Sequence, residues 1–390
     1  MILVRDMEGY VEQQILLSPL AFFIASQLDG LNTVTDIQYL FATHFDGQML
    51  TTDQIEQVTA YLDEHGFLSS DRFLAIRQRI EDEFRKSEIR KPYLAGKSYP
   101  TEPDALRKYL DELFVRDGGP GERPQPGITD GLPPLRGLIT PHIDLERGGH
   151  CYAHGYLRLC KQNQVKSVFI FGVAHVAPPV PIILTRKHFE TPLGVVRTDQ
   201  EIVECLAKTC AWDPFEFESI HRTEHSIEFQ VLMLAHLFGT DFRIVPMLCG
   251  PFVEERSPTS PDAVEPLAAF LRACRDLVKS LGDSCFVIAG ADLAHVGIRF
   301  GDDFEITDGI VQSVESRDRE DLAHVLELNP TAFYRSVMKD RNQRRVCGIN
   351  CIYAALKTLE GAATRAELLD YDYAPDPAGG MVSFANIVIS

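Results

Sequence analysis

The stretch "GLITPHIDLERGGH", residues 137–150, joins an apolar run to a cluster of polar residues. Its apolar run, 137–140, stops at Pro141 and predicts a short buried strand. His142 and Asp144 follow at once, and a pair of glycines after them predicts a sharp turn. In open α/β sheets, ligands collect beyond the carboxyl ends of the strands. We therefore expect His142 either to pack at a strand end or to point into a ligand crevice.

Outward from this stretch, apolar runs alternate with helical patterns. Strands are predicted at 135–140, 167–173, 180–185, 242–249, 284–290 and 381–389. Helices are predicted near 151–162, 199–210, 225–238, 262–281, 302–327 and 348–360. The alternation predicts an α/β sandwich around a largely parallel or mixed sheet over residues 91–390. Five glycines and five prolines in residues 117–134 predict an exposed loop there.

The composition limits the class of protein. A chain of 390 residues with 45% hydrophobic and 24% charged residues predicts a globular protein of at least two domains. A formal charge of −18 argues against general affinity for nucleic acid or anionic membranes. The uncharged run 167–185 contains three prolines, so it is not one spanning helix. Nine cysteines without a paired spacing, behind an N-terminus that lacks signal-peptide features, predict a cytoplasmic protein with reduced thiols.

Residues 1–90 have a different pattern and predict a separate module. Ser18, Thr33 and Thr51 each precede an apolar helical stripe, and residues 66–74 could form a hairpin. Three short helices and a hairpin predict a small winged-helix-like domain, and the pattern resembles PqqD-like domains, which recognise peptides. The first 70 residues carry ten acidic residues and one basic residue, Arg5, which excludes a DNA-binding domain. We expect a protein or peptide partner, and a helical cap on the main domain is the alternative.

Polar groups that can bind a metal follow several of the predicted strands. Besides His142 and Asp144, "SVFIFGVAHVAPP" delivers His175, "CFVIAGADLAHVG" delivers Asp292 and His295, and "EHSIEFQVLMLAHLFG" opens a helix with Glu224, His225 and Glu228. Neutral imidazole suits iron, copper and zinc, and two histidines with one anionic ligand form a common open site. The residue pattern leaves the third ligand open among the four candidates Asp144, Glu228, Asp292 and Cys347. A position at a helix N-terminus predicts a lowered pKa for the Cys347 thiol.

Several of these segments together resemble the Memo family, whose bacterial members include the AmmeMemoRadiSam system protein B. The motifs in family order are "LAGKSYP", "GLITPHIDLERGG", "FIFGVAHV", "TPLGVVRTD", "EHSIEFQVLML", "FRIVPMLCG", "VIAGADLAHVGIRFG" and "VCGINCIYAAL". The likeness covers about residues 92–390. It implies a fold similar to the LigB-type subunit of class III extradiol dioxygenases, which are non-haem iron enzymes.

The resemblance also implies roles for single residues. His142, His175 and Cys347 map onto a metal pocket of two histidines and one cysteine. Asp292 and His295 match the family's D-x-x-H pair, and His225 with Glu228 matches its EHSIE segment. His295 is then the candidate acid–base group, with Asp292 and His225 as further catalytic candidates. The family's usual PHAGY reads PHIDL here, which adds the Asp144 carboxylate and leaves substrate and metal open.

Three functions fit this pattern. The first is a metal-dependent, dioxygenase-like redox enzyme, with iron or copper favoured and zinc as the third option. The second is a non-catalytic accessory protein that binds a radical SAM enzyme or its peptide substrate through residues 1–90. The third is a metal-dependent hydrolase. The chain has no radical SAM cysteine triplet, so any such chemistry has to come from a partner.

Overall fold

The computed structural model describes residues 1–125, 135–161, 165–253 and 260–390. Residues 126–134 of the predicted loop lie outside this range, and residues 117–125 contain no helix or strand. The described chain divides into two compact units, Met1–Lys86 and Ser87–Ser390.

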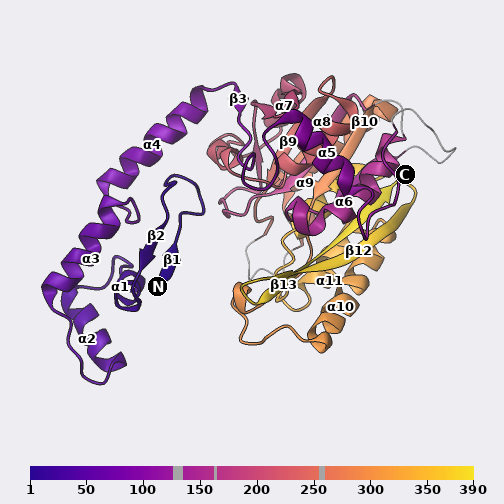
Figure 1. Cartoon of the computed structure of the whole chain (residues 1–390). Helices are drawn as coiled ribbons and strands as arrows, with labels where there is room; N and C mark the ends of the chain where they lie inside the picture. The colour runs from indigo at the N-terminus through magenta and orange to yellow at the C-terminus, as the bar shows by residue number, and fades with distance from the viewer. Residues whose placement is uncertain (126–134, 162–164, 254–259) are drawn as a thin grey trace. The chain divides into compact units, whose positions relative to one another are not determined.

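A mixed sheet forms the centre of the second unit, as predicted (Figure 1). Its middle is parallel, in the order β4 (Gly137–Thr140), β10 (Cys285–Gly290), β5 (Ser167–Val173), β9 (Arg243–Cys249) and β8 (Gly194–Thr198). Antiparallel strands extend it beside β4, namely β13 (Gly380–Ile389), β12 (Ala366–Asp376) and β11 (His295–Gly297). Beyond β8 lie β7 (His188–Thr191) and β3 (Ile89–Arg90), and β6 (Ile182–Leu184) pairs with β9.

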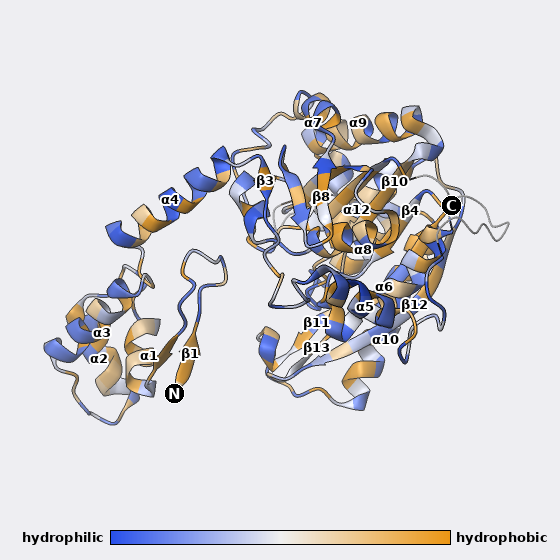
Figure 2. Cartoon of the chain, turned by 45° about the horizontal axis from the view of Figure 1, so that its top comes forward, coloured by the Kyte–Doolittle hydropathy of each residue, from blue (hydrophilic) through white to orange (hydrophobic). Residues whose placement is uncertain are grey.

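The side chains of the central strands alternate between the two faces of the sheet and are apolar on both. Helices therefore cover both faces, and each face has its own core. In β5, Phe169 and Phe171 belong to one core, whereas Val168 and Ile170 belong to the other. The first core is covered by α7 (Gln200–Ala207), α9 (Glu265–Leu281), α10 (Asp308–Leu326), α11 (Pro330–Met338) and α12 (Ile349–Leu359). The second is covered by α5 (Pro103–Leu113), α6 (Leu145–Cys160) and α8 (Glu228–Phe238). Figure 2 shows the apolar character of the central strands β4 and β10.

The turn predicted after His142 is wrong, because the paired glycines lie inside α6. A Cβ on Gly148 would lie 2.3 Å from Cγ2 of Ile143, and one on Gly149 would lie 2.7 Å from Cδ2 of Leu113. The glycines therefore let the first turns of α6 approach their neighbours closely, and they do not end the helix.

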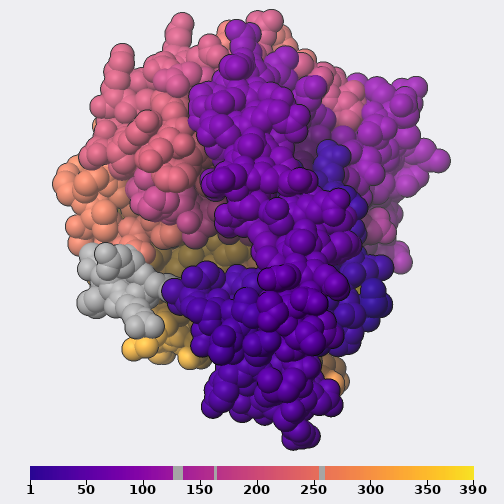
Figure 3. Space-filling model, turned by 90° about the vertical axis from the view of Figure 1, so that its left-hand side faces the viewer, coloured from indigo at the N-terminus to yellow at the C-terminus, as the bar shows by residue number. Residues whose placement is uncertain are grey.

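The first unit contains α1 (Pro19–Ser26), α2 (Val34–His44), α3 (Thr52–Glu64), α4 (Asp71–Lys86) and the antiparallel pair β1 (Ile2–Val4) and β2 (Ile15–Leu17). Figure 3 shows its surface in indigo and violet. Ser18, Thr33 and Thr51 cap α1, α2 and α3 as predicted, the last two in capping boxes. The hairpin predicted at 66–74 is wrong, because α4 begins at Asp71. An acidic residue at the start of this helix and the basic residues Arg85 and Lys86 at its end both interact favourably with the helix dipole.

Two further findings concern the described chain as a whole. None of its helices combines the length and apolar character that crossing a bilayer requires. All nine cysteines are free thiols, and six of them are buried.

Candidate metal centre

Three potential metal ligands meet at the carboxyl edge of the central strands. One ligand atom each from His142, His175 and Cys347 lies within 4.8 Å of the other two. Sγ of Cys347 is 3.5 Å from Nε2 of His142. A tetrahedral ion with bonds of about 2.0–2.3 Å separates its ligand atoms by about 3.3–3.8 Å. Small side-chain movements therefore suffice for these three groups to hold one ion.

His142 is held as a neutral imidazole whose Nε2 faces Sγ of Cys347 at 3.5 Å and Oδ2 of Asp292 at 3.6 Å. Its Nδ1 lies 3.0 Å from the carbonyl oxygen of Gly290, and since a carbonyl only accepts, Nδ1 carries the proton. Burial, followed by the nearby His175, lowers the pKa of His142 to about 3. A buried, uncharged ring with one nitrogen fixed by a carbonyl is the usual state of a histidine that binds a metal.

Asp292 fixes the backbone around His142. Its Oδ1 accepts hydrogen bonds from the main-chain N–H groups of His142 at 2.8 Å and Ile143 at 3.2 Å. Burial raises the pKa of Asp292, and these hydrogen bonds oppose the shift. Asp292 also belongs, with His295 and Cys347, to a second group whose ligand atoms lie within 4.8 Å of one another.

His175 is bound by a buried carboxylate, that of Glu224. Nδ1 of His175 lies 3.1 and 3.0 Å from the two oxygens of Glu224, which leaves Nε2 free. Desolvation lowers the pKa of His175, although its side chain is 39% exposed, but the charge of Glu224 and its hydrogen bond outweigh this effect, so the net shift is upward. Burial likewise raises the pKa of Glu224, and His175 and His225 reverse this, holding it well below its usual range.

His225 stacks on His175 at the same edge. Their ring centroids are 4.8 Å apart with an interplanar angle of 13°, and Nδ1 of His225 is 3.3 Å from Glu224. Burial lowers the pKa of His225 to about 4, against the opposing charge of Glu224. Its ring centroid is 5.5 Å from that of His142. The cluster therefore contains a third imidazole, with a lowered pKa, beside the two proposed as ligands.

His295 is attached to the loop that carries Cys347. Its main-chain N–H donates to the carbonyl of Arg344 at 2.7 Å, and its Nδ1 donates to the carbonyl of Leu293 at 3.2 Å. Burial lowers the pKa of His295, with the charge of Asp292 opposing it. The ring packs edge-on against Phe300, with centroids 5.1 Å apart. His295 thus also presents an unprotonated Nε2.

Cys347 precedes the N-terminus of α12, but its pKa is not lowered as predicted. Burial, followed by the charge of Asp292, raises the pKa of this thiol well above its usual value. The partial charge of a helix end does not compensate for removing a thiolate from water. A bound cation would reverse this shift, since a coordinating thiol is deprotonated by the ion.

Glu228 and Asp144 are used elsewhere. Glu228 forms a buried ion pair with Arg90 and accepts hydrogen bonds from the Tyr99 hydroxyl at 2.5 Å and the main chain of Tyr93 and Leu94. Asp144 caps α6 and accepts from Nε of Arg147 at 2.6 Å. Neither belongs to the groups of potential metal ligands found in the described residues.

Glu224 was predicted only as one of the polar groups at the start of a helix, without a role of its own. The available signal was its position directly before His225, since a carboxylate beside a histidine can orient imidazole rings. Gln230 was also missed, and its side chain donates to the carbonyl of Pro141 at 2.8 Å, next to His142.

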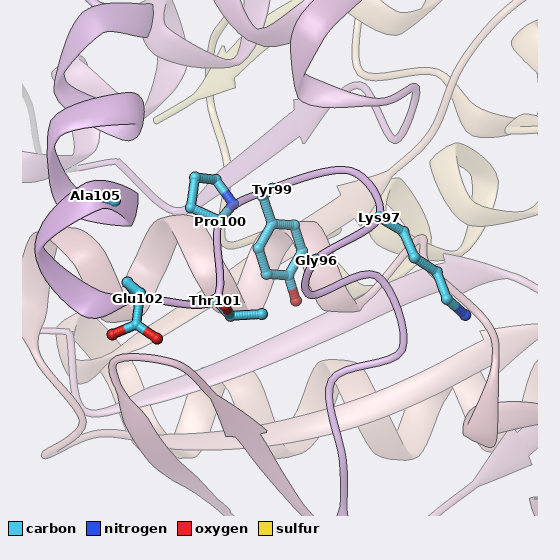
Figure 4. Close-up of a pocket in the computed structure, with 7 residues that line it drawn as sticks. All are labelled: Gly96, Lys97, Tyr99, Pro100, Thr101, Glu102 and Ala105. Atoms are coloured by element: carbon cyan, nitrogen blue, oxygen red, sulfur yellow. The ribbon is translucent and has the colours of Figure 1, made fainter.

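A separate surface hollow lies outside the histidine cluster. Figure 4 shows its lining, which is Gly96, Lys97, Tyr99, Pro100, Thr101, Glu102 and Ala105. The hydroxyl of Tyr99 bonds to Glu228, so this wall of the hollow belongs to the Arg90–Glu228 network. None of the candidate metal ligands lines it.

The fold and the cluster together define a mixed α/β protein with a candidate metal centre at the carboxyl edge of its sheet. The family model "Memo-like protein" matches residues 90–388. The chain belongs to the Memo family.

Curated relatives agree with this assignment. The chain is similar to a MEMO1 family protein of Aquifex aeolicus, with 28% identity over 389 residues, which cover 99% of this chain and 95% of the relative. It is similar to two archaeal MEMO1 family proteins over a shorter range. The Methanopyrus kandleri protein is 27% identical, with 77% of this chain and 98% of the relative covered. The Methanococcoides burtonii protein is 28% identical, with 77% and 100% covered.

Proposed function

We propose that this chain binds one transition-metal ion through Nε2 of His142, Nε2 of His175 and Sγ of Cys347, and uses it in a redox reaction. The observation that supports the proposal most strongly is that Nδ1 of each proposed histidine ligand is hydrogen-bonded to an acceptor. His142 donates from Nδ1 to a carbonyl and His175 donates from Nδ1 to a carboxylate, which leaves both Nε2 atoms available beside the thiol.

The ligand chemistry favours iron or copper, with zinc as the third option. Imidazole suits all three metals, and a thiolate shifts preference towards copper(I) or zinc. The resemblance to LigB-type dioxygenases supports iron. A site with only three protein ligands would stay open to a substrate, which is typical of a catalytic site and not of a closed structural one.

Once bound, the ion would supply Lewis acidity and electron transfer. The chain's own residues would orient ligands and move protons. His295 is proposed as the acid–base group, because its neutral ring presents Nε2 and its Nδ1 is fixed by Leu293. His225, which stacks on His175, is proposed as a second proton acceptor. Asp292 holds the His142 backbone in place.

Metal analysis of anaerobically purified protein tests the proposal. The wild type should retain about one equivalent of iron or copper, and His142→Ala and Cys347→Ala should lose it. His154→Ala and Cys205→Ala are matched controls, since His154 is half-buried, Cys205 is exposed, and neither belongs to the cluster. Equal metal content in the wild type and both ligand variants would contradict the proposal.

We further propose that residues 1–86 bind a protein or peptide with a neutral or basic surface, with a radical SAM protein or its peptide substrate as the partner implied by the resemblance. Most of the exposed large hydrophobic side chains in the described residues belong to this unit, among them Leu31, Tyr39 and Met49 at 86%, 71% and 70% exposure. Acidic residues outnumber basic ones around them. Pull-down by the full-length chain and by a chain lacking residues 1–86 tests this role, which fails if the truncated chain retains every partner.

A further inference from the structure

Glu224 is the most heavily hydrogen-bonded carboxylate at the cluster. Its Oε2 accepts from the main-chain N–H of His175 at 3.1 Å, and its Oε1 accepts from those of His225 at 2.7 Å and Ser226 at 3.0 Å. The same two oxygens face Nδ1 of His175 and Nδ1 of His225. The side chain is only 5% exposed. One buried carboxylate therefore contacts both the backbone and the ring of two neighbouring histidines.

These contacts connect two segments that are distant in the chain. His175 follows β5, whereas His225 and Ser226 precede α8. The hydroxyl of Ser226 reinforces the connection by donating to the carbonyl of Val173 at 3.0 Å. Gly172 allows this approach, because a Cβ there would lie 2.5 Å from the Ser226 hydroxyl.

The carboxylate also determines which nitrogen of His175 is free. A carboxylate without a proton only accepts hydrogen bonds, so Nδ1 of His175 carries the proton that it shares with Glu224. Nε2 then has its lone pair available. A carboxylate behind a metal-binding histidine fixes its tautomer and makes the ring a stronger donor to the ion.

We propose that Glu224 is the positioning residue of the metal centre. It selects the His175 tautomer with Nε2 free, and it fixes His225 in the stacked orientation beside it. This inference rests on the proposed metal site and adds to it the group that prepares the site before any ion binds.

Glu228 offers a matched control on the same segment. It is a buried glutamate of 2% exposure that also accepts main-chain and side-chain hydrogen bonds, but its partners are Arg90, Tyr99, Tyr93 and Leu94. Glu224→Gln and Glu228→Gln both replace a buried carboxylate with an isosteric amide. A purely structural role would therefore give similar results in the two variants.

The test is a Co²⁺ titration of the full-length wild type and both variants, monitored by visible absorption spectroscopy. Thermal unfolding of the three proteins is recorded in parallel. We expect Glu224→Gln to raise the Co²⁺ dissociation constant by about 10–100-fold and to shift the ligand-field bands. Glu228→Gln should change both by less than about twofold while lowering thermal stability. Equal affinity and identical spectra for Glu224→Gln and wild type would overturn the inference.

A second measurement avoids any dependence on folding of the variant. Long-range ¹⁵N–¹H correlation spectra of ion-free wild type, labelled at histidine, should show the proton of neutral His175 on Nδ1. A His175 protonated on Nε2 would overturn the inference. If the wild type binds no Co²⁺, iron or copper, the proposed function fails, and this spectrum alone decides the role of Glu224.

Discussion

Sγ of Cys347 lies 3.5 Å from Nε2 of His142, although 205 residues separate the two in the chain. Hydrogen bonds connect both segments to Asp292, which follows β10. The Asp292 carboxylate accepts from the main-chain N–H of His142 at 2.8 Å, and its carbonyl accepts from the N–H of Gly348 at 3.1 Å. The distance between the two proposed ligands thus depends on how closely α12 approaches this turn.

Gly348→Ala should weaken metal binding without removing a ligand. A Cβ at this position would lie 2.5 Å from Cβ of Ala291 and 2.6 Å from the carbonyl oxygen of Asp292, so α12 has to move away. We expect metal affinity to fall by about tenfold or more, as when a group that supports a metal ligand is changed. Gly309→Ala in α10 is the control, since its nearest neighbour would be 3.8 Å away. Unchanged affinity in Gly348→Ala would show that Cys347 is not held by this contact.

His295→Gln should impair turnover while leaving metal content close to that of the wild type. His295 is placed as an acid–base group, with Nδ1 bound to Leu293, and removing such a group costs about 10²–10⁴-fold in rate. Metal content is measurable before a substrate is known. Loss of the ion from this variant would make His295 a ligand, together with Asp292 and Cys347, with which it forms the second potential group.

Glu228→Gln should destabilise the Memo-like unit by about 3–5 kcal/mol near neutral pH, because the buried Arg90 loses its counter-charge. Burial alone would raise the pKa of Glu228, but Arg90, Tyr99 and the N–H of Leu94 outweigh it and lower the pKa below 4.5. The stabilisation is therefore present above pH 4.5 and is lost as the pH falls through the folded-state value.

Denaturant unfolding at several pH values measures this effect. The difference in unfolding free energy between wild type and Glu228→Gln should be largest near neutral pH and shrink in acid. A difference that stays constant down to pH 3 would contradict the assigned ion pair.

Removal of residues 1–86 should leave metal affinity unchanged within about twofold. The archaeal relatives align over 98% and 100% of their own length to 77% of this chain, and the family model begins at residue 90. All the proposed ligands belong to the unit Ser87–Ser390. The truncated chain has to start at Ser87, because Arg90 binds Glu228. A folded truncated protein that no longer binds metal would contradict this prediction.

The α/β architecture and the convergence of strand-end histidines were predictable from the sequence. The continuous apolar runs at residues 167–173 and 285–290 are typical of strands buried on both faces, and polar residues that follow parallel strands share one edge of the sheet. His142 and His175 were predicted as candidates in this way, and their ligand atoms lie near one another. The choice of Cys347 over other anionic candidates came only from the family resemblance.

Other features depend on tertiary contacts that periodicity does not report. Gly148 and Gly149 indicated a turn, yet their close packing against Ile143 and Leu113 places them in a helix. The spacing of His225 and Glu228 in the sequence would place them on one face of a helix. The carboxylate of Glu228 instead binds the buried Arg90, which lies 138 positions earlier in the chain. Burial of Cys347, which reverses the expected direction of its pKa shift, also arises only in the folded chain.

X-ray absorption spectroscopy of the iron- or copper-loaded protein detects the proposed ligands themselves. We expect one sulfur ligand at about 2.3 Å and at least two nitrogen ligands at about 2.0–2.1 Å from the ion. In Cys347→Ser the sulfur shell should disappear, while in the matched Cys205→Ser variant it should remain. An ion in the wild type with no sulfur ligand, or a sulfur shell that persists in Cys347→Ser, would contradict the proposed metal centre.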